Sequence, residues 1–178
     1  MVTLSRRDFA RATVTAAFAS NGPRAVAQQP GITVVALGAS NTQGWGVAPA
    51  EAYPVRLESL LRAKGVDATI LSAGVPGDTT GGMLDRLDGA VPGHAKLVLL
   101  QPGTNDERVG RGAETKANIE KIRSRLAARK IALLVVENAV LDALPRSELR
   151  DDGIHFTPAG YALLAERLLP SVLAALGR

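Results

Sequence analysis

The chain contains no cysteine, and this absence excludes several kinds of protein at once. Disulfide frameworks, zinc sites built from thiolates, iron–sulfur clusters and cysteine nucleophiles all need that residue. Aromatic residues make up only 3% of the 178 residues, so the core must be built mainly from aliphatic side chains. No uninterrupted apolar run reaches the ~18 residues that a membrane-spanning helix requires. The length and these absences predict one globular domain without a transmembrane segment.

The net charge of +4 is concentrated at the N-terminus. Residues 1–27 hold four of the 21 basic residues and one of the 17 acidic ones, so they carry three of the four net positive charges. The rest of the chain is nearly neutral. A nearly neutral body lacks the basic surface with which proteins bind phosphate backbones, and we therefore expect no nucleic-acid partner.

Residues 1–27 have the features of an export signal. Ser5-Arg6-Arg7-Asp8-Phe9 resembles the twin-arginine motif, and a mildly apolar stretch follows at residues 10–20. Ala25-Val26-Ala27 fits a small-residue cleavage site before Gln28. This order predicts a twin-arginine export signal over residues 1–27, a precursor that binds the twin-arginine export machinery, and a periplasmic or secreted mature protein of residues 28–178. The alternative is an ordinary basic tail.

Strand-like and helix-like segments alternate in the remaining sequence. Continuous apolar runs predict buried strands at residues 32–37, 68–73, 96–101 and 131–136. Helical spacing of apolar residues and stop signals predict helices at residues 53–64, 80–87, 113–129 and 158–176. Such alternation predicts an α/β fold, a three-layer α/β/α sandwich around a flavodoxin-like, mostly parallel sheet of four to five strands.

Polar clusters follow three of these strands and precede the last helix. They occupy residues 38–42, 74–79, 103–106 and 151–155. Ligands of open α/β sheets bind at the carboxyl ends of the strands, so the clusters are expected to meet at one edge of the sheet.

The clusters contain a candidate for each part of an acyl-transfer mechanism. Ser40 is a candidate nucleophile, His155 a candidate base, and Asp152, three residues earlier, a candidate for orienting the imidazole. Gly77 can present a backbone N–H to a developing oxyanion, and Asn105 can offer a side-chain N–H.

The four clusters together resemble the sequence blocks of the SGNH hydrolases, the GDSL-type esterases and lipases. The matching stretches are Gly38-Ala39-Ser40-Asn41-Thr42, Gly77-Asp78-Thr79, Gly103-Thr104-Asn105-Asp106 and Asp152-Gly153-Ile154-His155, within a resemblance that spans about residues 32–176. The resemblance implies a Ser40–His155–Asp152 triad and an oxyanion hole from the backbone N–H groups of Ser40 and Gly77 and the side chain of Asn105. It also implies ester hydrolysis through an acyl-serine, with neither a metal nor an organic cofactor.

Two features depart from the family pattern. Ala39 replaces the acidic residue that normally precedes the nucleophile and helps to brace its loop. Residues 137–150 are too few for the helix and fifth strand that relatives usually have there. We therefore expect a last sheet edge that is either exposed or covered by residues 139–149, with this segment forming a wall of an open, shallow acyl site that favours small acyl groups.

Several functions remain open from the sequence. The leading hypothesis is an exported serine esterase for carboxylic esters or thioesters, similar to acyl-CoA thioesterases and lysophospholipases, acting on a small-molecule or glycan ester. The alternatives are a polysaccharide deacetylase of the same family and a non-catalytic ligand-binding relative. A metal site built from Asp78, Asp106, Asp152 and His155 would match no standard ligand spacing.

Overall fold

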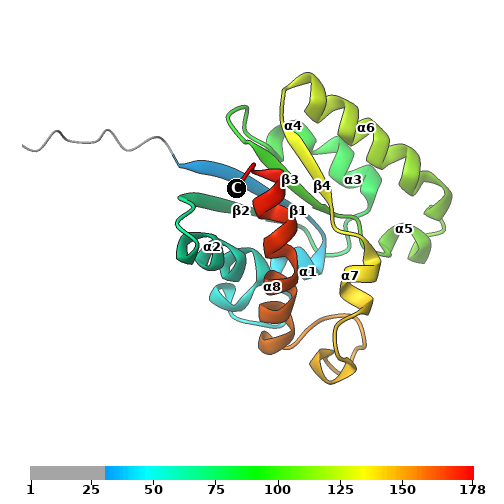
Figure 1. Cartoon of the computed structure of the whole chain (residues 1–178). Helices are drawn as coiled ribbons and strands as arrows, with labels where there is room; N and C mark the ends of the chain where they lie inside the picture. The colour runs from blue at the N-terminus through cyan, green and yellow to red at the C-terminus, as the bar shows by residue number, and fades with distance from the viewer. Residues whose placement is uncertain (1–30) are drawn as a thin grey trace, which may run out of the picture.

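The structure is a computed structural model that describes residues 31–178. The predicted export signal lies outside the described residues. Four parallel strands form one sheet in the order β2-β1-β3-β4 (Figure 1). They are β1 (Ile32–Gly38), β2 (Ala68–Gly74), β3 (Leu97–Gln101) and β4 (Ala132–Val135). The predicted parallel sheet is confirmed, with the lower of the two expected strand numbers.

Helices cover both faces of the sheet, as the three-layer prediction requires. One face carries α2 (Tyr53–Ala63) and α8 (Pro158–Ala175), which pack against each other. The other carries α3 (Thr80–Asp85), α4 (Leu87–Ala90) and α6 (Thr115–Ala128). No helix within residues 31–178 combines the length and hydrophobicity needed to cross a bilayer.

The core is divided by the sheet into two apolar clusters. Successive side chains of a strand point to opposite faces, so Val34 and Ala36 of β1 enter the cluster beneath α2 and α8. Val35 and Leu37 enter the other cluster, which lies beneath α3, α4 and α6. All four are fully buried, which explains why the strand is a continuous apolar run rather than an alternating one.

The loops contain short helical elements that the sequence pattern did not separate. The predicted helix over residues 80–87 is divided at Arg86 into α3 and α4, and a 3₁₀ turn precedes α6. Between β4 and α8 the chain forms only α7 and a 3₁₀ turn, without a fifth strand. The short elements are α1 (Ser40–Gln43), η1 (Pro49–Glu51), α5 (Asn105–Arg108), η2 (Gly112–Glu114), α7 (Asn138–Asp142) and η3 (Arg146–Glu148).

Candidate active site

Ser40 lies just beyond the carboxyl end of β1, one of the two inner strands of the sheet and the one that precedes the first polar cluster. The strand ends at Gly38, where an added Cβ would lie 2.1 Å from Thr42 Oγ1, so the close approach of α1 requires glycine. Ala39 is buried in the apolar cluster on the α3 side. Helix α1 then begins at Ser40, which places the hydroxyl at the edge of the sheet.

Ser40, His155 and Asp152 form a continuous chain of hydrogen bonds. His155 Nε2 lies 2.8 Å from Ser40 Oγ, and His155 Nδ1 lies 2.7 Å from Asp152 Oδ2. With Nδ1–H donating to the carboxylate, Nε2 is left to accept the hydroxyl proton. The structure thus brings together three residues that are up to 115 positions apart in sequence.

Asp152 is held by the backbone of the loop that carries His155. Its Oδ1 accepts hydrogen bonds from the backbone N–H groups of Ile154 and His155, both at 2.9 Å. The backbone N–H of His155, then its ring, hold the pKa of the Asp152 carboxyl well below its usual range. The carboxylate is therefore ionised at neutral pH and fixed in the direction of the imidazole.

The three candidate oxyanion donors follow three different strands. In the described part of the chain, the backbone N–H groups of Ser40 and Gly77 donate to no acceptor. Gly77 has φ 75°, in the left-handed region that favours glycine. Asn105 Nδ2 donates to the carbonyl oxygen of Asp78 at 2.8 Å, which orients the amide and leaves its second N–H available. Ser40 and Asn105 line one cavity, whereas Gly77 is not among its lining residues.

A cavity of about 420 Å³ opens beside Ser40. Residues 138–149, which we call the α7–η3 segment, form one of its walls, as expected from the sequence. Polar groups of this segment, Asn138, Asp142 and Arg146, also line the cavity. The apolar lining comes from Leu141, Leu144, Leu149, Ile154 and Phe156.

Asn41 and Tyr161 connect the two loops of the site, and sequence reasoning gave neither a role. Asn41 Nδ2 donates to the carbonyl oxygen of Ile154 at 3.2 Å, and Tyr161 Oη donates to Asn41 Oδ1 at 3.0 Å. Burial raises the pKa of Tyr161, so its hydroxyl stays a neutral donor. The bridge links α8, α1 and the loop that carries His155. In the sequence, the position of Asn41 beside Ser40 was the only indication of this bridge.

Arg86 braces the loop in which Ala39 replaces the expected acid. Its Nη2 donates to the carbonyl oxygen of Gly38 at 3.0 Å, and its Nε donates to Asp78 Oδ2 at 2.7 Å. The guanidinium thus ties the end of β1 to the loop of Gly77. Since Arg86 lies 48 residues from Gly38, no local sequence signal pointed to this contact.

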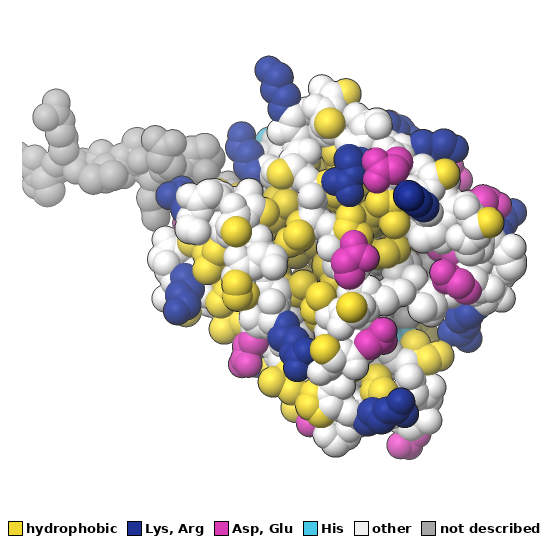
Figure 2. Space-filling model, turned by 45° about the vertical axis from the view of Figure 1, so that its right-hand side comes forward, with side chains coloured by type: hydrophobic (Ala, Val, Ile, Leu, Met, Phe, Trp, Pro, Cys, Tyr) yellow, Lys and Arg dark blue, Asp and Glu magenta, His cyan; other side chains and the backbone are white. Residues whose placement is uncertain are grey.

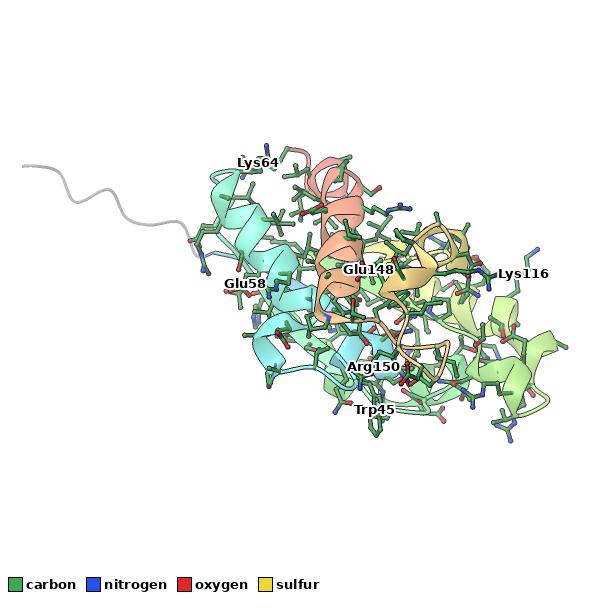
Figure 3. All side chains as sticks on the ribbon, turned by 90° about the horizontal axis from the view of Figure 1, so that it is seen from below. Trp45, Glu58, Lys64, Lys116, Glu148 and Arg150 are labelled. Atoms are coloured by element: carbon green, nitrogen blue, oxygen red, sulfur yellow. The ribbon has the colours of Figure 1, made fainter. Side chains whose placement is uncertain are left out.

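Trp45 extends the site on the side of α1. The residue is 49% exposed, and its ring lies 5.9 Å from the His155 ring, centroid to centroid. Arg150 Nη1 donates to the carbonyl oxygen of Gly46 at 2.9 Å, which joins this loop to the segment before Asp152. Figure 3 shows Trp45 and Arg150 close together at one edge of the molecule. This edge provides an exposed aromatic surface beside the imidazole.

The carboxylates considered for a metal site have different partners. Asp78 pairs with Arg86, and Asp106 accepts from the N–H and hydroxyl of Thr80 at 2.9 and 2.6 Å. Within residues 31–178, no group of three acidic or histidine side chains is arranged to hold a metal ion. The four residues therefore do not form one ligand set.

More than half of the chain matches a known protein family. Residues 36–148 match the GDSL-like Lipase/Acylhydrolase family. The chain belongs to this family. The match includes the loops of Ser40, Gly77 and Asn105 and ends before Asp152. No curated protein sequence matches the chain.

Several solved structures share the fold. TesA is 20% identical with a TM-score of 0.74, over 80% of this chain and 99% of TesA. AlinE4, an SGNH-hydrolase family esterase, is 27% identical with a TM-score of 0.61, over 83% and 98% of the two chains. A family 3 carbohydrate esterase from Clostridium thermocellum is 17% identical with a TM-score of 0.64, over 83% and 99%. The chain is thus an SGNH hydrolase with the family's α/β/α fold.

Proposed function

We propose that this protein is a serine esterase that cleaves carboxylic esters or thioesters through an acyl-serine intermediate. The observation that carries the proposal is the hydrogen-bonded chain from Ser40 through His155 to Asp152. A serine hydroxyl is a weak nucleophile unless a neighbouring base accepts its proton. The 2.8 Å contact between Ser40 Oγ and His155 Nε2 supplies that base.

Acylation starts from the ester bound in the cavity beside Ser40. Ser40 Oγ attacks the carbonyl carbon while its proton passes to His155 Nε2. The ionised Asp152 stabilises the imidazolium through Nδ1–H. The negative charge that develops on the carbonyl oxygen is met by the backbone N–H groups of Ser40 and Gly77 and by the free N–H of Asn105. Collapse of this intermediate breaks the ester bond, and His155 returns the proton to the leaving alcohol or thiol.

Deacylation repeats these steps with water. His155 takes a proton from a water molecule, whose oxygen attacks the acyl carbon. The bond between this carbon and Ser40 Oγ then breaks, His155 gives the proton to Ser40 Oγ, and the acid leaves. The apolar wall of the α7–η3 segment can hold the acyl chain during both steps. A cavity of about 420 Å³ accommodates more than an acetyl group, so we favour short to medium acyl chains over the small acyl groups expected from the short segment.

Turnover of a chromogenic ester tests the mechanism. We expect hydrolysis of a p-nitrophenyl ester and stoichiometric labelling by a serine-reactive phosphonate, both lost in Ser40→Ala. Ser59→Ala is the matched control, because Ser59 is exposed on α2 and its hydroxyl only donates to the carbonyl oxygen of Val55. Full activity in Ser40→Ala would contradict the proposal. A folded protein with neither turnover nor labelling would favour a non-catalytic ligand-binding relative.

The second candidate function is deacetylation of a polysaccharide. The polar groups of Asn138, Asp142 and Arg146 at the cavity favour it, since sugar hydroxyls need such hydrogen-bond partners. Comparing acetylated oligosaccharides with p-nitrophenyl esters of two to ten carbons separates the two candidates. A kcat/KM that is highest for the acetylated sugar would favour deacetylation, and one that rises with acyl length would favour the esterase.

We also propose that the precursor is exported through the twin-arginine machinery. Support comes from the sequence alone, from the order of Ser5–Phe9, the apolar stretch and Ala25-Val26-Ala27. Changing Arg6 and Arg7 together to Lys should retain the uncleaved precursor inside the cell. Changing Arg11 and Arg24 to Lys is the control, and export that survives the first change would contradict this route.

A further inference from the structure

The two edge strands of the sheet, β2 and β4, differ in whether a side chain pairs with their outward-directed backbone groups. At the β2 edge, the backbone N–H of Ile70 donates to Glu58 Oε2 of α2 at 2.8 Å, and Glu58 also pairs with Arg62. Figure 3 shows Glu58 on α2. A charged side chain at an edge hinders the addition of another strand. The β2 edge is thus protected by its own neighbouring helix.

The β4 edge has no such protection. Ala132 N–H donates to the carbonyl oxygen of Lys96 at 3.0 Å, and Val136 N–H donates to that of Leu100 at 2.7 Å. Because the groups of successive residues alternate in direction, Leu133 and Val135 direct their N–H and C=O groups away from β3. No hydrogen bond meets these groups from any part of residues 31–178. A strand of this kind is a template for pairing with another chain.

The side chains along this edge are apolar and only half-buried. Leu133 and Val135 pack against the cluster on the α6 side, and Leu134 packs against the cluster on the α8 side. Figure 2, in which the right-hand side of Figure 1 comes forward, shows hydrophobic side chains along the middle of the visible face with charged ones around them. The edge therefore offers both unpaired backbone groups and apolar surface.

We propose that β4 pairs antiparallel with β4 of a second copy of this chain, so that two four-stranded sheets become one. Antiparallel pairing sets outward-directed residues opposite each other. With Leu134 of both copies on the two-fold axis, Leu133 of each copy faces Val135 of the other, and all their free N–H and C=O groups are satisfied. Pairing ends at Ile131, whose N–H already donates to the carbonyl oxygen of Leu126 at 3.0 Å.

The charged residues beside β4 favour a second copy of this chain as the partner that pairs with the β4 edge. Arg129 and Lys130 precede the strand, and Glu137 follows it. Lys130 and Glu137 are both exposed. In the antiparallel arrangement, Glu137 of each copy faces Ile131 of the other, next to Lys130. A two-fold interface is self-complementary in this way, with opposite charges meeting twice.

Cross-linking of the full chain tests the register directly. The natural chain has no cysteine, so Leu134→Cys introduces the only thiol. Residues in a non-hydrogen-bonded antiparallel pair have Cα atoms about 4.5 Å apart, within the range that disulfides span. We expect Leu134→Cys to form a disulfide-linked dimer under mild oxidation. Leu71→Cys on the β2 edge, where Leu71 is 40% exposed, is the matched control and should remain monomeric.

Sedimentation measurements give the second readout. The unmodified chain should have twice the monomer mass at micromolar concentration. Leu133→Pro should be a folded monomer, because it removes only an N–H that points away from β3. A monomeric natural chain, a dimer that persists in folded Leu133→Pro, or equal cross-linking of Leu71→Cys and Leu134→Cys would overturn the proposal. Esterase activity is measured separately, so failure of either proposal is recognised independently.

Discussion

Arg86 and Asp78 form an ion pair, with Nε and Oδ2 2.7 Å apart, that connects the loops of Ser40 and Gly77. The pair is mostly buried, with the two side chains 26% and 11% exposed, and Arg86 also donates to the carbonyl oxygen of Gly38. Ala39, the residue before the nucleophile, has no polar group with which to brace this loop. The guanidinium of Arg86, at the end of α3, holds the loop of Ser40 in place instead.

Replacing Arg86 should therefore impair catalysis without removing a group that touches the substrate. Arg86→Lys keeps the charge but cannot hold both Asp78 and Gly38 in the same geometry. We expect kcat to fall roughly 10- to 100-fold with KM little changed, because small misplacements of reacting groups are costly. Arg125→Lys is the control, since Arg125 forms an exposed ion pair with Asp88. Unchanged kcat in Arg86→Lys would show that the brace is not needed.

Asp152→Asn should leave the fold intact and reduce turnover. The amide cannot accept the Nδ1–H of His155 as a carboxylate does, and it favours the wrong tautomer of the ring. We expect kcat for a p-nitrophenyl ester to fall roughly 10⁴-fold, as for the equivalent change in serine proteases. Asp151→Asn, at the neighbouring exposed carboxylate, should retain activity. A loss of less than tenfold in Asp152→Asn would show that Asp152 does not orient the base.

The same pair of variants predicts a pH dependence of stability. The pKa of Asp152 is lowered in the folded state by hydrogen bonds from His155 and Ile154. A carboxyl with a lowered pKa stabilises the fold above its unfolded pKa of about 3.9, and the contribution is lost as the pH falls further. The Tm advantage of the natural protein over Asp152→Asn should therefore persist from pH 8 to about 5 and shrink towards pH 3. Thermal unfolding of Asp151→Asn, measured over the same pH range, is the matched comparison.

Removal of the Tyr161 hydroxyl should destabilise the protein and loosen the loop that carries His155. Tyr161→Phe leaves the buried amide oxygen of Asn41 without its donor, at a cost of about 1–2 kcal/mol in the free energy of unfolding by urea. We also expect a lower kcat, because Asn41 holds the carbonyl oxygen of Ile154. Tyr53→Phe is the control, since burial raises the pKa of Tyr53 to about 12 and its hydroxyl meets only Thr42, at 3.4 Å. Equal kcat losses in both variants would argue against a specific bridge.

The α7–η3 segment should set the acyl chain length that the site accepts. Leu144 is buried at the cavity wall, and Leu144→Phe should fill part of the space. We expect the ratio of kcat/KM for octanoyl over acetyl esters to fall roughly tenfold or more. Val109→Phe, at a surface residue that is 57% exposed, should leave the ratio unchanged. An unchanged ratio in Leu144→Phe would place the acyl chain elsewhere.

Local sequence patterns predicted the strands and most helices well. The apolar runs at residues 32–37 and 68–73 match β1 and β2 to within one residue, because strands buried on both faces need continuous apolar side chains. The predicted helix over residues 158–176 matches α8, with Thr157 as its N-cap and Pro158 in the first turn. The segment after β4 was less predictable, because short turns of helix there depend on packing against the core rather than on periodicity.

The sequence by itself determined the fold class and the set of candidate site residues. Residue type and order are enough for this, since each loop follows a strand and the carboxyl ends of parallel strands share one edge. Only the tertiary structure decided how the site is supported. The contacts of Arg86 with Gly38 and of Tyr161 with Asn41 join residues 48 and 120 positions apart, and no local pattern specifies them. The free edge of β4 was likewise decided in three dimensions, because it depends on which groups the neighbouring helices leave uncovered.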